Sequence, residues 1–165
     1  MRILVVSDSH SGTSFMLRCA EKVKPDAVIH LGDYYDDGEV LRDECPNARV
    51  WLLPGNCDRY RAPIHAKEIL VDKIGGVRFY MTHGHLHNVK TTLVRLLAAA
   101  RAEKADVVLY GHTHQAYCVQ EEDGLWVLNP GSCGYYGGSA GLIEVGDGQV
   151  KSCRLIRESD LEEFA

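Results

Sequence analysis

Residues 1–33 read MRILVVSDSHSGTSFMLRCAEKVKPDAVIHLGD. Two apolar runs, Ile3 to Ser7 and Ala27 to Leu31, flank a helical pattern near Thr13 to Val23. A second helical pattern near Gly38 to Cys45 and a third apolar run from Val50 to Leu53 continue the alternation. Strands that alternate with helices are typical of βαβ units, so this part of the chain predicts a parallel sheet.

The rest of the chain predicts a second group of strands. Gly75-Gly76 can adopt the positive φ angles of a tight hairpin turn, which indicates a hairpin of Lys67 to Val71 and Val77 to Met81. A long helix is expected from about Val89 to Glu103, because its apolar residues recur at three- and four-residue spacing. Mostly antiparallel strands are then expected at Val107 to Tyr110, Ala116 to Gln120, Leu125 to Leu128, Ala140 to Val145 and Val150 to Ile156, with turns at Asp123-Gly124 and Asp147-Gly148. Two packed mixed β-sheets with helices on their outer faces, an α/β fold of four αββα layers, accommodate this order in a single domain over residues 1–165.

Composition narrows the function classes. The 165 residues carry a formal charge of -5 and form no basic stripe, so no stable nucleic-acid complex is expected. No apolar run approaches the ~20 residues that span a bilayer, and Ile3 to Val6 is too short for a signal peptide, so we expect a cytoplasmic protein with no membrane partner. The six cysteines form no C-x-x-C pair and predict mostly reduced thiols in the core.

Short polar motifs follow the apolar strands. They are Asp8-Ser9-His10, Gly32-Asp33, Gly55-Asn56-Cys57-Asp58, His83-Gly84-His85 and Gly111-His112-Thr113-His114. Loops at the carboxyl ends of strands converge on one edge of an α/β sheet, so residues distant in sequence become neighbours there. Carboxylates, imidazoles and an amide without clustered thiolates suit Mn, Fe, Zn, Co or Ni rather than calcium.

Each motif also has an ordinary interpretation. Alone, Asp8 could cap the following helix and Asp33 could be a turn residue. His30, His65 and His87 lie outside any motif and are interpreted as ordinary core or surface histidines. The ordered set of motifs, each at a strand end, favours a metal site over these separate interpretations.

In this order the motifs resemble those of the calcineurin-like metallophosphoesterases, specifically the small single-domain phosphodiesterases of bacteria and archaea. The resemblance extends from Asp8 through Asn129-Pro130-Gly131-Ser132. It implies two divalent metal ions, with Mn²⁺ preferred and Ni²⁺, Fe²⁺, Co²⁺ or Zn²⁺ as alternatives. It further implies that Asp8, His10 and His114 bind one ion, that Asn56, His83 and His112 bind the other, and that Asp33 bridges both.

The chain departs from the better-known family members at Cys57, where many of them have a histidine implicated in protonating the leaving group. A thiol with a reference pKa near ~8.5 is less well matched to neutral pH than an imidazole. Cys57 is therefore either a proton donor or a packing residue, and His85 is the alternative acid. The catalytic candidates are Asp33, Asn56, Cys57 and His85.

The predicted activity is hydrolysis of a small phosphodiester by a hydroxide held between two metal ions. A phosphomonoesterase is the nearest alternative. A weakly active interaction scaffold, like the retromer-subunit relatives of the same fold, is a second one, and a nuclease is a third. Asn129 to Ser132 is expected to shape the backbone, and Gly134 to Gly138, with Tyr135 and Tyr136, could form a wall of the substrate cleft. Exposed hairpin edges are compatible with a homo-oligomer.

Overall fold

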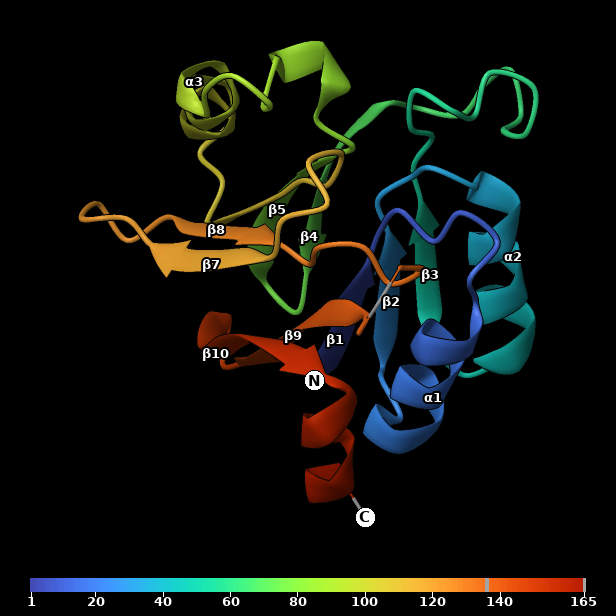
Figure 1. Cartoon of the computed structure of the whole chain (residues 1–165). Coiled ribbons are helices and arrows are strands. Elements are labelled where there is room, and N and C mark those ends of the chain that lie inside the picture. The colour runs from blue at the N-terminus through green and yellow to red at the C-terminus, as the bar shows by residue number, and fades with distance from the viewer. Residues whose placement is uncertain (136, 165) are drawn as a thin grey trace.

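The computed structural model describes residues 1–135 and 137–164. Two five-stranded mixed sheets pack face to face, with helices on their outer sides (Figure 1). This is the αββα arrangement predicted from the sequence, so the expected fold class is confirmed. None of the described helices is long and apolar enough to cross a membrane.

The first sheet contains the βαβ units of the N-terminal half. Its central strands β1, β2 and β3 run parallel, and β9 and β10 extend it through antiparallel pairs. The strands are β1 (Arg2–Val6), β2 (Ala27–His30), β3 (Arg49–Leu52), β9 (Ser139–Gly146) and β10 (Gln149–Arg157), in the order β10-β9-β1-β2-β3. Helices α1 (Ser14–Val23) and α2 (Tyr35–Glu44) lie on its outer face (Figure 1).

The second sheet has the order β4-β5-β6-β8-β7. Its strands are β4 (Ile69–Ile74), β5 (Val77–Thr82), β6 (Val107–Leu109), β7 (Tyr117–Gln120) and β8 (Trp126–Asn129). The strands β5, β6 and β8 are parallel, so the expectation of mostly antiparallel pairing was wrong for β6. Helix α3 (Val94–Ala102) and the 3₁₀ turn η1 (His85–His87) lie in the segment that joins β5 to β6, and this crossover lets the two strands run in the same direction.

The predicted turns at Gly75-Gly76 and Asp147-Gly148 are two-residue hairpins, whereas Asp123-Gly124 lies in the longer loop 121–125 between β7 and β8. Gly75 and Gly76 have φ angles of 60° and 86° between the paired residues Ile74 and Val77. Asp147 and Gly148 likewise have positive φ angles between β9 and β10. Positive φ at both central residues matches the right-handed twist of the strands, which explains why these dipeptides set the hairpins.

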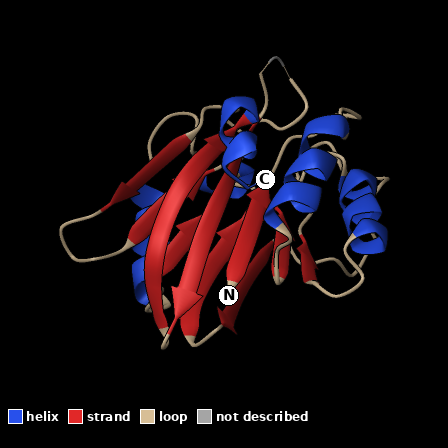
Figure 2. Ribbon diagram, turned by 90° about the horizontal axis from the view of Figure 1, so that it is seen from below, coloured by secondary structure: helices blue, strands red, loops and turns tan. Residues whose placement is uncertain are grey.

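The main hydrophobic core lies between the sheets. Ile3 and Ile29 from the first sheet pack in one cluster with Phe79, Met81 and residues of β6 and β8 from the second. A second cluster joins the first sheet to α1 and α2, and a third joins the second sheet to α3. The curved sheets and the helices that cover them are seen from below in Figure 2.

Two helix boundaries differ from the predicted ones. Helix α2 begins at Tyr35, earlier than expected, because the Asp58 carboxylate accepts hydrogen bonds from the N–H groups of Tyr34 and Tyr35. Helix α3 begins only at Val94, because residues 88–93 form turns and the Thr92 hydroxyl accepts a hydrogen bond from the Val94 N–H. Its predicted apolar face is correct, since Leu96 and Ala100 are buried.

The acidic C-terminal segment forms an unpredicted 3₁₀ helix, η2 (Glu158–Phe164). Leu161 is buried in the cluster around α1, and Arg18 of α1 makes an ion pair with Glu158. The segment therefore packs on the side of the first sheet that α1 covers.

Candidate metal centre

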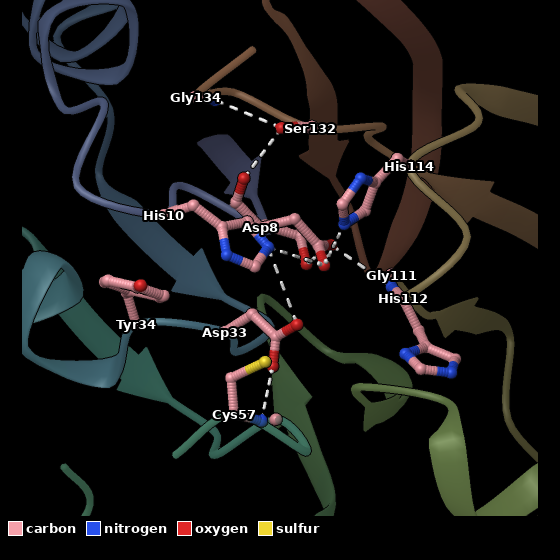
Figure 3. Close-up of polar contacts among 12 residues, drawn as sticks. Asp8, His10, Asp33, Tyr34, Cys57, Gly111, His112, His114, Ser132 and Gly134 are labelled. Carbon is pink, nitrogen blue, oxygen red and sulfur yellow. Dashed lines mark hydrogen bonds and ion pairs between the residues drawn. The ribbon is translucent and has the colours of Figure 1, made fainter.

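The predicted ligands lie where loops from both sheets converge, and Figure 3 shows Asp8, His10, Asp33, His112 and His114 among them. The first sheet supplies Asp8 and His10 after β1, Asp33 after β2 and Asn56 after β3. The second sheet supplies His83 after β5 and both His112 and His114 after β6. The packing of the two sheets therefore brings together residues that lie far apart along the chain.

Potential ligand atoms fall into two groups that share Asp33. One group comprises Asp8, His10, Asp33 and His114, and the other comprises Asp33, His83 and His112. Within each group one ligand atom from every residue lies within 4.8 Å of the others. Such spacing brings the side chains close enough to converge on a common cation.

The Asp8 carboxylate has two different oxygens. Its Oδ2 atom accepts hydrogen bonds from the Ser7 hydroxyl at 2.5 Å and the His112 backbone N–H at 3.1 Å. Its Oδ1 atom lies 3.1 Å from Nε2 of His114 and 3.9 Å from Nε2 of His10. One oxygen is thus used to fix the side chain, while the other faces the imidazoles.

Asp33 faces both groups. Its Oδ1 atom accepts a hydrogen bond from the Cys57 N–H at 3.0 Å and lies 3.5 Å from Nε2 of His83. Its Oδ2 atom lies 3.6 Å from Nε2 of His10 (Figure 3). The carboxylate therefore presents a separate oxygen to each group of ligand atoms.

The structure also orients the buried imidazole of His83. Its Nδ1 atom lies 2.9 Å from the Leu31 carbonyl, which can only accept, so Nδ1 carries the proton. Its Nε2 atom faces Asp33 and lies 3.1 Å from Oδ1 of Asn56. Fixing the tautomer through a carbonyl is a common way to prepare a histidine ligand.

The local electrostatics favour a cation. Burial lowers the pKa of His83, but the nearby Asp33 and Asp8 carboxylates outweigh it, and the net pKa is raised. Burial likewise opposes ionisation of Asp33, yet its hydrogen bonds and the charge of His83 hold its pKa well below the usual range. Burial and the charge of His83 lower the pKa of His112 to about 4, so this imidazole is neutral at neutral pH and can act as a ligand.

The backbone at the centre is strained. Asp8, His10, Asp33, His112 and His114 have φ angles between 45° and 68°, in the left-handed region that such residues rarely adopt. Non-glycine residues in this region concentrate at functional sites, where the surrounding structure compensates for their cost. Gly55 permits the close approach of two of these loops, because a Cβ atom there would lie 2.5 Å from the Asp33 backbone nitrogen.

Unpaired polar atoms test whether a metal ion fits. Oδ1 of Asp8 and Nε2 of His10 are buried and make no hydrogen bond within the described part of the chain. Both atoms face the shared space between the carboxylates and imidazoles. The nearest groups to Oδ1 of Asp8 are imidazole nitrogens, at 3.1 Å for His114 and 3.9 Å for His10. A buried carboxylate oxygen is stabilised by a nearby cation, and carboxylate with imidazole suits a first-row divalent metal. The residues therefore fit the group that the sequence predicted.

A family comparison agrees with this geometry. Residues 1–147 match the model of the calcineurin-like phosphoesterase superfamily domain. The chain belongs to this superfamily. The match covers every candidate ligand, so the resemblance stated from the motifs is confirmed.

Curated relatives of this phosphoesterase are small microbial proteins. The phosphodiesterase MJ0936 of Methanocaldococcus jannaschii is 30% identical over 94% of this chain and 98% of its own length. The probable metallophosphoesterase YsnB of Bacillus subtilis is 32% identical over 80% of this chain and 75% of its own. Together with the family match, these relatives support a metal-dependent phosphoester hydrolase.

Solved structures share the fold. A predicted phosphoesterase from Streptococcus pneumoniae superposes with a TM-score of 0.71 at 25% identity, over 95% of this chain and 97% of the other. Vps29 from Chaetomium thermophilum superposes with a TM-score of 0.74 at 19% identity, over 96% of each chain. At that lower identity the likeness concerns the fold alone.

Several predicted residues of the phosphoesterase surround the candidate ligands. Cys57 is exposed, so it is not a buried packing residue. Partial desolvation of its thiol and the charge of Asp33 raise the pKa of that thiol. His85 lies beside His83, with ring centroids 5.5 Å apart. Tyr135 lies 5.3 Å from His10 and 5.5 Å from His114 by ring centroids, as a cleft wall would, whereas Tyr136 is outside the described residues.

The sequence motifs did not predict a buried hydrogen-bond network behind the ligand loops. The Ser9 hydroxyl lies 3.1 Å from Nε2 of His30 and donates to Oδ2 of Asp37 at 2.7 Å. Nδ1 of His30 accepts the Gly32 N–H at 3.2 Å, so the proton is on Nε2 and is directed at Ser9. The network joins the Asp8 loop to the Asp33 loop of the phosphoesterase. The proximity of His30 to the Gly32-Asp33 motif was the available signal.

Further hydrogen bonds around the centre hold the backbone of the ligand loops and not the imidazole rings. Asp58 accepts hydrogen bonds from the N–H groups of Tyr34, Tyr35 and Gly55, so it fixes two ligand loops. Ser132 donates to the Asp8 carbonyl at 2.7 Å (Figure 3). Asn129 donates to the Gly111 carbonyl and the Thr113 hydroxyl, which agrees with the backbone-shaping role expected for Asn129 to Ser132. His65 is exposed, and His87 is buried against the Tyr80 hydroxyl, away from the ligands.

Proposed function

We propose that this chain is a phosphodiesterase that uses two divalent metal ions, with Mn²⁺ preferred, to hydrolyse a small phosphodiester. The observation that carries the proposal is the position of Asp33, whose two oxygens face two separate groups of ligand atoms. Asp8, His10 and His114 hold one ion in this proposal, Asn56, His83 and His112 hold the other, and Asp33 bridges them.

Each part of the site has a defined task in this proposal. Two bound metal ions lower the pKa of a shared water and stabilise the charge that develops on the phosphoryl group. Asp8 and Asp33 offset the repulsion between the cations, and the neutral imidazoles and Asn56 leave the site positive enough to attract a phosphate anion. The Leu31 carbonyl accepts a hydrogen bond from Nδ1 of His83, so Nε2 is the ring nitrogen that is left to bind a metal ion.

The weakness of the available proton donors supports a diester as the substrate. Cys57 follows Asn56 directly, and its raised thiol pKa makes it a weak acid. His85 is the other candidate proton donor, and its Nε2 atom lies 3.4 Å from Oε1 of Glu68. A phosphodiester carries a single negative charge. When its leaving group is already stable as an anion, hydrolysis needs little protonation by an acid. The relative MJ0936, which carries the name phosphodiesterase, supports the same choice.

Removal of metal tests the proposal. The purified protein should lose hydrolysis of bis(4-nitrophenyl) phosphate after exhaustive chelation and regain it with about two equivalents of Mn²⁺. It should hydrolyse 4-nitrophenyl phosphate, a monoester, more slowly. His114→Ala should weaken metal binding in a calorimetric titration, whereas His65→Ala, at an exposed histidine outside the site, should not.

Three results would count against the proposal. Full activity after chelation, with no metal found by elemental analysis, would exclude the metal mechanism. A preference for the monoester would favour a phosphomonoesterase. Metal binding without hydrolysis of either substrate would favour an interaction scaffold.

A further inference from the structure

A cavity of about 480 Å³ opens directly beside the candidate metal centre. Asn56, a candidate ligand, and His85 line its inner side. The cavity continues outward along the loop that joins β3 to β4, where apolar side chains form much of its wall: Pro54, Ala62, Pro63, Ile64 and Ala66. Its size lies in the range of about 300–1,000 Å³ that small-molecule sites occupy, and a phosphoryl group alone would leave much of it empty.

The loop that forms this wall has a defined shape. The Asp58 carbonyl accepts hydrogen bonds from the N–H groups of Arg61 and Ala62, and the Pro63 carbonyl accepts one from Ala66. Arg61 is bound to Asp36 at 3.0 Å, and its guanidinium lies 3.8 Å above the ring of Tyr34. Successive turns and this anchor on α2 hold the wall in place.

Ile64 is the unusual residue of the wall. Its side chain is fully exposed, although it lies on an ordered turn and lines the cavity. A large aliphatic side chain in water gains free energy when an apolar surface covers it. A molecule bound in the cavity would supply such a surface, because Ile64 lines the cavity.

The charges of the cavity limit what this molecule can be. Asp58 is buried and uses its oxygens on backbone N–H groups, and Glu68 lies against His85. Arg59 lines the cavity, and no carboxylate in the described ranges lies within ion-pair distance of its guanidinium. This guanidinium lies 5.4 Å from the centroid of the Tyr60 ring. Without a carboxylate partner it disfavours a cationic group, and its other face can stack on a second aromatic ring.

We infer that this cavity is a specificity pocket that binds one ester arm of the substrate, and that the arm is an uncharged or anionic aromatic ring. The inference rests on the proposed function, because the phosphoryl group must sit at the metal centre for the arm to reach the cavity past Asn56 and His85. The ring contacts Ile64 and the apolar wall, and Arg59 stacks on it or neutralises its charge.

Two anions test the pocket separately from the metal centre. Inorganic phosphate has no arm, whereas phenylphosphonate has the same kind of anionic head and one aromatic arm. Their dissociation constants for the Mn²⁺-loaded protein are measured by calorimetry. Phenylphosphonate should bind more tightly than phosphate. Ile64→Ser should weaken the binding of phenylphosphonate by roughly tenfold and leave the binding of phosphate unchanged, because only the aromatic arm loses a contact.

Matched variants complete the experiment. Ile64→Leu should retain tight binding of phenylphosphonate, because it preserves an apolar side chain. Val94→Ser makes a similar change at an exposed apolar residue on α3, outside the cavity, and should not change the dissociation constant of either anion. Equal effects of Ile64→Ser on both anions, or none on either, would overturn the pocket and leave the metal centre intact. Failure of both anions to bind the wild-type protein would overturn the proposed function together with the pocket.

Discussion

The two sheets contribute different chemistry to the candidate centre. The first sheet supplies both carboxylates, Asp8 and Asp33, together with the Asn56 amide and the His10 imidazole, whereas the second supplies imidazoles alone. Each of the two ligand groups draws residues from both sheets. Neither sheet could hold either group by itself, so the site depends on the face-to-face packing of the sandwich.

The sheets also differ in how their loops are held. The loops of the first sheet are tied by side chains that are not themselves candidate ligands, namely Ser9, His30 and Asp58. In the second sheet His83 is fixed by a carbonyl of the first sheet, and the His112 N–H donates to Asp8 of the first sheet, in addition to the support that Asn129 gives the Gly111 carbonyl. The first sheet therefore acts as the template on which the imidazoles of the second are placed. Four predictions test this division of roles.

The largest effect is expected from the core that joins the sheets. Phe79 is fully buried on β5 in the cluster shared by both sheets. Phe79→Ala should lower the free energy of unfolding by about 3–5 kcal/mol, because it leaves a cavity between the sheets. The measurement is urea denaturation followed by circular dichroism. Phe79→Leu should cost clearly less, and equal stability of the alanine variant and the wild type would contradict a core that couples the sheets.

The next effect concerns Asp33, the residue that both ligand groups share. Asp33→Asn should lower kcat/KM for an aryl diester by about 10²–10³-fold, because one carboxylate faces both groups. His114→Ala should lose less, since His114 belongs to one group only. Circular dichroism must show that both variants are folded. The shared role would be wrong if His114→Ala abolished turnover while Asp33→Asn retained most of it at saturating Mn²⁺.

A moderate effect is expected from the network behind the first sheet's loops. Ser9→Ala removes the hydroxyl that joins His30 to Asp37 and should weaken Mn²⁺ binding by about 10–100-fold, as loss of such supporting contacts typically does. Calorimetric titration with Mn²⁺ measures it.

Two control variants separate positioning from general damage. Ser9→Thr should retain most of the metal affinity, because it keeps the hydroxyl. Ser152→Ala removes a hydroxyl that bonds Glu144 on the first sheet and should not change Mn²⁺ binding. Unchanged affinity in Ser9→Ala would mean that the template does not depend on this network.

The smallest effect is expected at Cys57 with aryl substrates. Cys57→Ala should retain most hydrolysis of bis(4-nitrophenyl) phosphate, because nitrophenolate leaves without a proton, and should lose more with an alkyl diester if the thiol donates one. Cys57→Ser keeps the size but is a weaker acid and should behave like alanine in that case. Complete loss with the aryl diester, in a folded variant that binds metal, would point to an essential contact at the centre.

Local sequence signals determined much of this protein. Strand and helix periodicity predicted the αββα class, and Gly75-Gly76 and Asp147-Gly148 predicted two hairpins, because positive φ is a property of the residues in the turn itself. The motifs at strand ends selected the residues that the structure brings together. These signals work because they depend on neighbours within a few positions along the chain.

Only the tertiary structure decided the rest. The early start of α2 depends on Asp58, which lies 23 residues beyond Tyr35. The roles of Ser9 and His30 depend on two loops meeting, and the cavity at Ile64 depends on the course of the loop around it. The parallel pairing of β6 was hidden because strand direction is set by the crossover and not by the strand's own residues. Each of these features arises from distances between segments that are remote in sequence, and those distances exist only once the two sheets have packed.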